Sequence, residues 1–409
     1  MDQDIKTGWL IDGTGNPAVA GAVLGIRNGR IESIQTESDY GGTSAEDHTR
    51  RVTDLSAYTI LPGLIDAHVH LSMSGTTDAA KREKQLRAGY DNIEAAIAGH
   101  LENHIRCGII AVRDGGDHGG HVGRYKQTSQ IKNPVPVIIK TAGKAWYKKG
   151  RYGRLTGTPV LEGLSLAGSI DNILGDPHKA YHIDHVKVIN SGLNSLSDFG
   201  KQTPPQFEAD ELEEAVNLCS MRGLKIMAHA NGELPVNVSI DSGCHSIEHG
   251  FFMGAANLEK MSEKRIVWVP TAFTMKAYAA LSDLATPRRD VALRNLDYQM
   301  EQISVARNFG VKIGLGTDSG SPGVHHGASL CEELKILMDS GYSPEEGIQC
   351  ATSVNAELLG LNDLGRLTHG RRANFIVIKG HPSDLPGNLE SITSVYIDGK
   401  EVDHSKLSG

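Results

Sequence analysis

The feature that most constrains the fold is an alternation of apolar runs with helical stretches, which begins at residue 60. Most of the runs are separated by a helical segment, such as 208–222 or 288–309. Strands that alternate with helices form parallel sheets, and eight such units close into a barrel. We therefore predict an α/β fold with a (β/α)₈ TIM-like barrel. The eight runs are 60–69, 108–113, 135–141, 185–189, 224–229, 244–248, 266–271 and 311–317.

Both ends of the chain lack this alternation. Residues 1–59 contain short strand-like runs with a turn at Asn28-Gly29, and such runs return after residue 366 with a turn at Asp398-Gly399. We expect the two ends, 1–59 and 366–409, to form one small β-sandwich domain. The segment 60–365 would then be the barrel domain.

Composition limits the partners. The formal net charge of −8 leaves no basic excess for a nucleic acid or an anionic membrane. No apolar run reaches the ~18 residues of a membrane span, and the polar start of the chain lacks the features of a secretory signal. Five cysteines without a C-x-x-C pair indicate reduced thiols. We expect a cytoplasmic homo-oligomer that binds a small-molecule substrate, with no nucleic-acid or membrane partner.

Histidines and an aspartate stand where several predicted strands end. His68 and His70 end the first run, His229 the fifth, His249 the sixth, and Asp318 the eighth. Active sites of barrels lie at the C-terminal ends of the strands, and residues two apart on a strand face the same side. Imidazole and carboxylate ligands suit zinc and similar ions, and an aspartate beside metal-bound water can accept its proton. The alternatives are core histidines and an aspartate that caps a helix or turn.

The sequence resembles the amidohydrolase superfamily, and the resemblance covers the whole chain, including the split β domain. The first-strand motif Leu61-Pro-Gly-Leu-Ile-Asp-Ala-His68-Val-His70 is the most specific part. The other matching segments follow in the family's order: 186–188, 228–230, 246–250 and 316–318.

The resemblance implies a binuclear centre with two divalent ions, for which Zn²⁺ is the expected metal. Lys187 matches a fourth-strand lysine that is carboxylated and bridges the two ions; without the resemblance, a lysine that reaches solvent is the simpler interpretation. A bridging hydroxide would be the nucleophile, and Asp318 would act as general base and then acid. The implied ligands are His68, His70 and Asp318 for the more buried ion, His229 and His249 for the second, and Lys187 for both.

Local likeness is strongest to the imidazolonepropionase-like branch, which includes Xaa-Pro and Xaa-Arg dipeptidases, through segments 110–116, 185–192 and 246–250. This favours hydrolysis of an amide C–N bond in a dipeptide or N-acyl amino acid. A carbamate or urea hydrolase is one alternative. Another is a mononuclear deaminase or dechlorinase of a heterocycle, although Glu233 follows His229 by four residues where three are expected. The last is a non-enzymatic scaffold, which the filled ligand positions disfavour.

A long connection, 142–184, separates the third and fourth predicted strands and departs from many relatives. Its part 144–154 holds five basic and three aromatic residues. We expect this part to cover the barrel mouth and bind a substrate carboxylate, because arginine holds carboxylates bidentately. A solvated loop or a dimer contact is the alternative. The predicted substrate contacts are Trp146, Tyr147, Arg151, Tyr152 and Arg154, together with His325 and His326 after the eighth strand.

Overall fold

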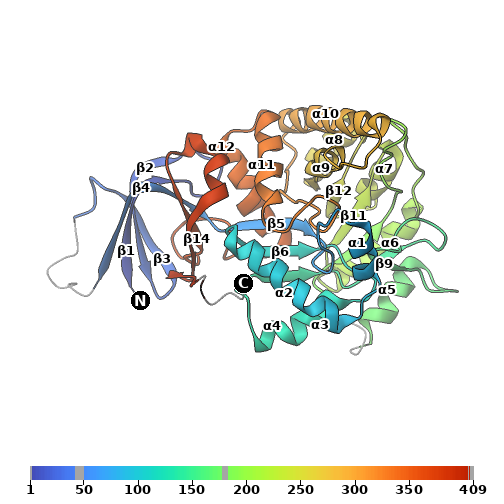
Figure 1. The fold of residues 1–409 in the computed structure, drawn as a ribbon, viewed down its shortest axis with the longest axis horizontal. Coiled ribbons are helices and arrows are strands. Elements are labelled where there is room, and N and C mark those ends of the chain that lie inside the picture. Colours follow the sequence, from blue (N-terminus) through green and yellow to red (C-terminus); the bar gives the residue numbers. More distant parts are fainter. Residues whose placement is uncertain (1, 42–49, 177–182, 404, 406–409) are drawn as a thin grey trace.

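The computed structural model describes residues 2–41, 50–176, 183–403 and 405, and a sheet built from both chain ends lies at one end of the molecule (Figure 1). Its strand order is β16-β15-β14-β4-β1-β2-β3. The sheet folds over on itself, because Arg30 bridges Arg372 and the side chain of Gln3 donates to the Gly399 carbonyl (2.6 Å). The seven strands are β1 (Gln3–Leu10), β2 (Val19–Arg27), β3 (Arg30–Thr36), β4 (Arg51–Pro62), β14 (Phe375–Lys379), β15 (Ile392–Ile397) and β16 (Lys400–Glu401).

The two predicted turns connect neighbouring strands of this sheet. Asn28 and Gly29 join β2 to β3 with φ angles of 49° and 75°, and Asp398 and Gly399 join β15 to β16 with 50° and 68°. Positive φ at both central residues matches the right-handed twist of a hairpin, which explains the Asn-Gly and Asp-Gly pairs.

Parallel strands form the barrel wall, as predicted. A three-stranded sheet has the order β5-β6-β7, and a six-stranded sheet has the order β13-β12-β11-β10-β8-β9. The eighth predicted run, 311–317, has an isolated bridge from Ile313 to Trp268, and a second bridge joins Ser319, just after the run, to Val69. These bridges place the run between β13 and β5. The wall strands are β5 (Leu64–Val69), β6 (Ile109–Asp114), β7 (Ile138–Thr141), β8 (Ala145–Tyr147), β9 (Gly157–Pro159), β10 (Val186–Ile189), β11 (Ile226–Ala230), β12 (Ser246–His249) and β13 (Val267–Val269).

The first predicted run, 60–69, is wrong as a single strand. Its first residues end β4 in the outer sheet, and β5 begins the barrel at Leu64. The change of sheet occurs between consecutive amides, since Gly63 N donates to Asn374 O (3.1 Å) and Leu64 N to Gly108 O (2.9 Å). Glycine fits the junction without a clash, whereas a Cβ there would lie 2.6 Å from Cδ1 of Ile110, which would have to move.

Helices cover the outside of the barrel (Figure 1). Helix α6 begins with a capping box formed by Glu208 and Glu211, and α10 ends at Gly310 in a left-handed conformation, close to the predicted bounds. The helices are α1 (Ala79–Leu86), α2 (Tyr90–Arg106), α3 (His121–Gln127), α4 (Ser129–Lys132), α5 (Leu166–Leu174), α6 (Ala209–Met221), α7 (Glu233–Asp241), α8 (Ala255–Lys264), α9 (Phe273–Ala279), α10 (Thr286–Phe309), α11 (Ser329–Asp339), α12 (Pro344–Gln349) and α13 (Asn355–Leu359).

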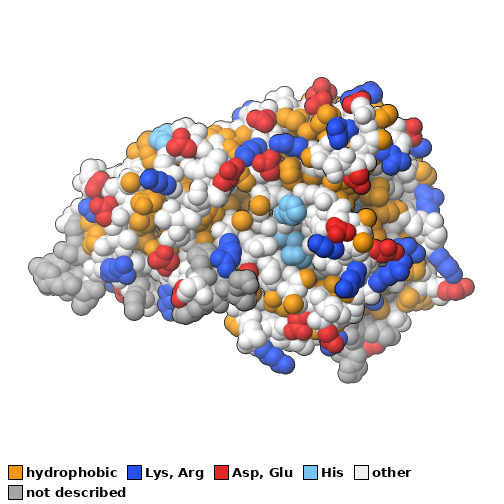
Figure 2. Space-filling model, viewed as in Figure 1, with side chains coloured by type: hydrophobic (Ala, Val, Ile, Leu, Met, Phe, Trp, Pro, Cys, Tyr) orange, Lys and Arg blue, Asp and Glu red, His pale blue; other side chains and the backbone are white. Residues whose placement is uncertain are grey.

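The surface in Figure 2 mixes acidic and basic side chains over the barrel. Within the described ranges, no helix combines the length and the apolar character needed to cross a membrane.

Candidate metal centre

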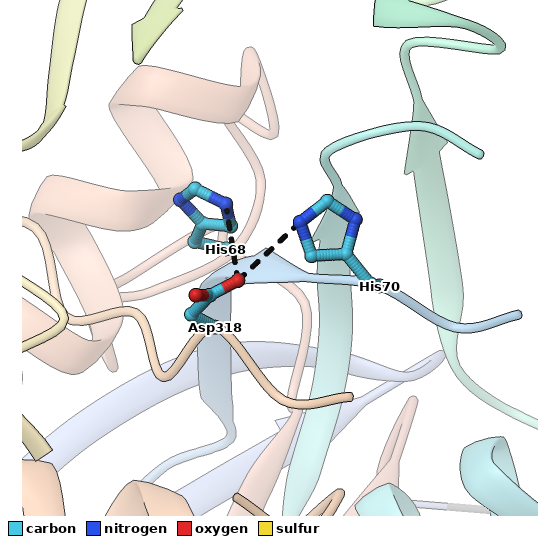
Figure 3. Close-up of side chains that lie close together, drawn as sticks. All are labelled: His68, His70 and Asp318. Atoms are coloured by element: carbon cyan, nitrogen blue, oxygen red, sulfur yellow. Dashed lines mark ion pairs between the residues drawn. The ribbon is translucent and has the colours of Figure 1, made fainter. Parts of the chain in front are cut away.

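Two histidines and an aspartate lie together where β5 and the 311–317 run end (Figure 3). The Nε2 atoms of His68 and His70 lie 3.6 and 3.3 Å from Oδ1 of Asp318. The backbone sets this arrangement: Asp318 N donates to the His68 carbonyl and His70 N to the Ser319 carbonyl, both at 2.8 Å. Asp318 has a φ of 58°, an uncommon conformation that often marks a functional position.

The three other predicted ligands line the same cavity, which has a volume of about 190 Å³. Lys187 comes from β10, His229 from β11 and His249 from the end of β12. The ring centroid of His249 lies 4.6 Å from that of His229 and 5.1 Å from that of His68. The structure thus brings all six predicted ligand positions to one cavity at the C-terminal ends of the barrel strands.

Two nitrogens of the predicted metal ligands are buried without a protein partner. Lys187 Nζ and His68 Nε2 are shielded from solvent and have no hydrogen-bond partner among the residues that the structure describes. Leaving a buried donor or acceptor unpaired costs about 1–3 kcal/mol, so a ligand in the cavity would stabilise both atoms. Burial lowers the pKa of the Lys187 amine to about 8, so more of this amine is neutral near pH 7 than in an exposed lysine. Imidazoles, a carboxylate and a modifiable amine form a donor set that fits divalent ions.

Comparison with known proteins places the chain in a family. Residues 59–402 match the model of the amidohydrolase family. The chain belongs to this family. The predicted family membership is confirmed, and the protein is a hydrolase that acts on carbon–nitrogen bonds.

Relatives agree in length and fold with this amidohydrolase. An imidazolonepropionase of Paracoccus denitrificans is 27% identical over 392 residues, covering 88% of this chain and 89% of the relative. A Xaa-Pro dipeptidase crystal structure with methionine bound in the active site superposes with a TM-score of 0.81 at 24% identity, covering 98% of this chain and all of the other. The A. niger ochratoxinase structure gives 0.80 at 20% identity, covering 98% and 95%. These structures confirm the predicted fold class.

In each of three histidines of the amidohydrolase, one ring nitrogen contacts a neighbouring oxygen, and this contact determines which nitrogen remains available to the cavity. His70 Nδ1 donates to the Gly116 carbonyl (3.0 Å), so its Nε2 keeps a free lone pair. In His229 the two ring nitrogens have exchanged roles: Nε2 donates to the Gly192 carbonyl (3.1 Å), and Nδ1 is left free. His249 uses Nδ1 in a 2.7 Å contact with Thr271 Oγ1.

A buried hydrogen-bond network holds the Nδ1 side of the His68 ring. Its Nδ1 donates to Glu248 Oε2 (2.7 Å), and Glu248 Oε1 accepts from Arg113 (2.8 Å). Arg113 also donates to Ser246 Oγ (2.9 Å) and to the Ala67 carbonyl (2.6 Å). Burial raises the pKa of the Glu248 carboxyl, but Arg113 and His68 outweigh it and hold that pKa below the usual value. Glu248 therefore stays ionised and fixes the His68 tautomer.

The surroundings of Asp318 keep its carboxyl group ionised. Burial raises the pKa of its carboxyl, but the adjacent rings of His70, His68 and His249 lower this pKa by more, so the net shift is downward. Ser321 Oγ donates to Asp318 Oδ2 (3.0 Å), which leaves Oδ1 toward the two histidines.

Among the predicted substrate contacts, the structure places one at the cavity. Tyr152 lines the cavity, whereas the six other predicted substrate contacts do not. Residues 145–147 form β8, which pairs with β10, so Trp146 and Tyr147 are buried in the barrel wall. Arg151 and Arg154 are exposed, and Arg151 donates to the Pro204 carbonyl (3.3 Å). The remaining two are His325, which is exposed, and His326, which is buried against His100 (ring centroids 4.0 Å apart).

Sequence reasoning missed the residues that complete the cavity wall. They come from α1, α9 and the connection after β10: Arg82, Tyr278, Leu193, Asn194 and Leu196. The charged sequence of α1 carried no signal that set Arg82 apart from its neighbours. Glu248 carries a local signal in the sequence, because it lies one residue before His249 and on the same strand face as Ser246.

Proposed function

We propose that the protein hydrolyses an amide bond of a small molecule, a dipeptide or an N-acyl amino acid, with two divalent ions in its cavity. The observation that carries the proposal is the unpartnered Lys187 amine, buried in the same cavity as four histidines and an aspartate. Zn²⁺ is the ion that we expect, because imidazole and carboxylate ligands suit it. The six cavity ligands named above would hold the two ions.

Carboxylation of Lys187 accounts for its burial. A neutral amine attacks carbon dioxide, loses a proton and becomes a carbamate with two oxygens, whereas an ammonium has three donors and no acceptor. The pKa of about 8 keeps a useful fraction of the amine neutral near pH 7. The carbamate would supply an oxygen for each ion.

Divalent ions in such a site lower the pKa of water toward neutrality and polarise the substrate carbonyl. The chain itself moves the proton. Asp318 Oδ1, beside His70 and His68, would take the proton from the attacking water, and Ser321 would hold the other oxygen in place. Asp318 would then pass the proton to the leaving nitrogen as the C–N bond breaks.

Relatives support a small substrate. One neighbour is a Xaa-Pro dipeptidase with methionine in its active site, and one sequence relative is an imidazolonepropionase. A cavity of about 190 Å³ is compatible with ligands of this size. The mononuclear deaminase alternative has less support, because Lys187 lines the cavity and Glu233 does not.

Metal analysis combined with a substrate panel tests the proposal. Protein reconstituted with Zn²⁺ and bicarbonate should hold close to two ions per chain and hydrolyse members of a dipeptide and N-acyl amino acid panel. Lys187→Ala should lose one ion and activity, with partial recovery of both in acetate or propionate, which can fill the vacated site. One ion per chain in the parent protein, with a mass that shows no carboxylation of Lys187, would favour the deaminase. Cleavage of carbamates or phenylureas, without cleavage of the panel amides, would favour a carbamate or urea hydrolase.

A further inference from the structure

One positively charged side chain in the cavity has no acidic partner. Arg82 extends from α1 into the cavity wall. Its Nη1 donates to the carbonyls of Gly320 (2.6 Å) and Ser74 (3.4 Å), and Nη2 lies 3.9 Å from the sulfur of Met73. No ion pair of Arg82 occurs within the described part of the chain. These contacts orient the guanidinium and leave donors on Nη2 and Nε unused.

Two phenols stand beside this guanidinium. Tyr152 follows β8 and Tyr278 lies on α9, so the three side chains reach the cavity from separate segments. Burial raises the pKa of both tyrosines and Asp318 raises it further, while Arg82 lowers it. The phenols therefore remain protonated donors, and neither hydroxyl has a hydrogen-bond partner among the described residues.

Part of the rim beside these groups is apolar. Leu193 is 58% exposed and Leu155 is 38% exposed, although both line the cavity. Leu196, Met275 and Phe251 continue this surface toward the interior. Exposed leucines at a cavity rim would lose unfavourable contact with water when an apolar group binds.

We propose that Arg82, Tyr152 and Tyr278 form an anion subsite that binds a free carboxylate of the substrate, while the leucine-lined rim takes an apolar group. The inference rests on the proposed amide hydrolysis and narrows its substrates to N-acyl amino acids or dipeptides with a free carboxylate. Arginine pairs with carboxylates through two parallel hydrogen bonds, and tyrosine hydroxyls add donors. Arg82 thus takes the role that the sequence assigned to Arg151 and Arg154.

Binding of a matched acid and amide tests the subsite without relying on turnover. The probes are N-acetyl-L-leucine and N-acetyl-L-leucinamide, titrated by calorimetry into the Zn²⁺-loaded protein carrying Asp318→Asn. Mass spectrometry of the recovered probes verifies that they stay intact. The acid should bind more tightly, and Arg82→Met should reduce the preference for the acid by roughly 10- to 100-fold, as expected for lost charge-assisted hydrogen bonds.

Three variants serve as controls. Arg87→Met removes a cation from the end of the same helix, where Arg87 is exposed and pairs with Glu83, and should keep the full preference. Arg151→Ala with Arg154→Ala should also keep it. Tyr152→Phe combined with Tyr278→Phe should lower the preference while all backbone contacts of Arg82 stay in place, so it still gives a result if Arg82→Met fails to fold.

An unchanged preference in Arg82→Met at equal zinc content would overturn the subsite, because the ions or another group would then bind the carboxylate. The same holds if the parent binds both probes equally. Loss of the preference, combined with no hydrolysis of any panel amide by the wild-type protein, would leave the subsite standing and reject the proposed function. Hydrolysis of panel amides by the wild-type protein, combined with a preference for the acid that Arg82→Met does not reduce, would support the proposed function and reject the subsite.

Discussion

Asp318 has an uncommon backbone conformation, and Ser321 holds one of its carboxylate oxygens, which fits a role as general base and acid. Asp318→Asn should retain both ions but lose about 10²- to 10⁴-fold in kcat, the usual scale for a general acid–base group, because an amide still offers an oxygen and cannot accept a proton. Zinc content and steady-state rates measure this. Wild-type kcat at full zinc content would show that Asp318 only holds the ion.

Glu248 contacts His68 and does not line the cavity. Glu248→Gln should weaken zinc binding by roughly 10- to 100-fold, the usual cost of losing a partner that orients a metal ligand, because an amide can no longer hold the His68 Nδ1–H as a carboxylate does. Competition with a chelator measures the affinity. Thr271→Val, which removes the neutral partner of His249, is the matched variant and should cost less. Equal effects of the two variants would argue against an ionised Glu248.

These side chains show how much of the site the sequence could predict. Strand alternation and strand ends predicted His68 and His70 as neighbours, because two residues on one strand face one side regardless of tertiary detail. Arg82 could not be found this way, because its position depends on how α1 packs over Met73 and Gly320. Arg151 was predicted as a substrate contact because its charge suits a carboxylate, but it does not line the cavity. The direction in which a loop points does not follow from its composition.

At the scale of elements, the predicted strands and helices differ from the structure mainly at their ends. Helices 208–222 and 288–309 were placed within two residues because caps and glycines mark them locally. The 144–154 segment was predicted as a cover, yet it contributes β8 to the barrel wall through a pairing of Trp146 with Val188. Such pairing between distant segments leaves little local trace in a three-residue strand.

The start of helix α9, which carries Tyr278, is held by a carboxyl group from α11. Glu333 accepts from the amides of Ala272 (2.8 Å) and Phe273 (2.7 Å), and burial raises its pKa to about 8 from an ordinary value of 4.5. A carboxyl whose pKa is raised on folding stabilises the protein fully below pH 4.5, and this contribution is lost as the pH rises through about 8.

Glu333→Gln should therefore make the free energy of unfolding of the metal-free protein fall less between pH 5.5 and 8.5, by at most ~1.4 kcal/mol per pH unit for one proton. Denaturant unfolding at several pH values measures the slope. The neighbour Glu332 is the control: hydrogen bonding to Lys335 lowers its pKa, so Glu332→Gln should leave the slope in this range unchanged. Identical slopes in wild type and Glu333→Gln would mean that Glu333 titrates normally.

At the scale of the whole molecule, the outer sheet and the barrel share one continuous stretch of backbone. The strand β4 leads into β5 through Gly63, whose amide bonds to Asn374 from the C-terminal part of the chain. The metal ligands His68 and His70 follow within one strand length. A disturbance at this junction therefore reaches the sheet, the barrel and the candidate metal centre together.

Gly63→Ala tests this coupling. The added Cβ would lie 2.6–2.9 Å from three side-chain carbons of Ile110, and overpacking of this kind costs about 1–3 kcal/mol. Gly99→Ala is the matched control, since Gly99 lies within α2 with nothing within 4 Å of the added atom, and it should stabilise the protein by about 0.5–1 kcal/mol. Denaturant unfolding and zinc affinity should both fall in Gly63→Ala and neither should fall in Gly99→Ala. Lower stability with unchanged zinc affinity would show that the junction supports the sheet but does not position the ligands of β5.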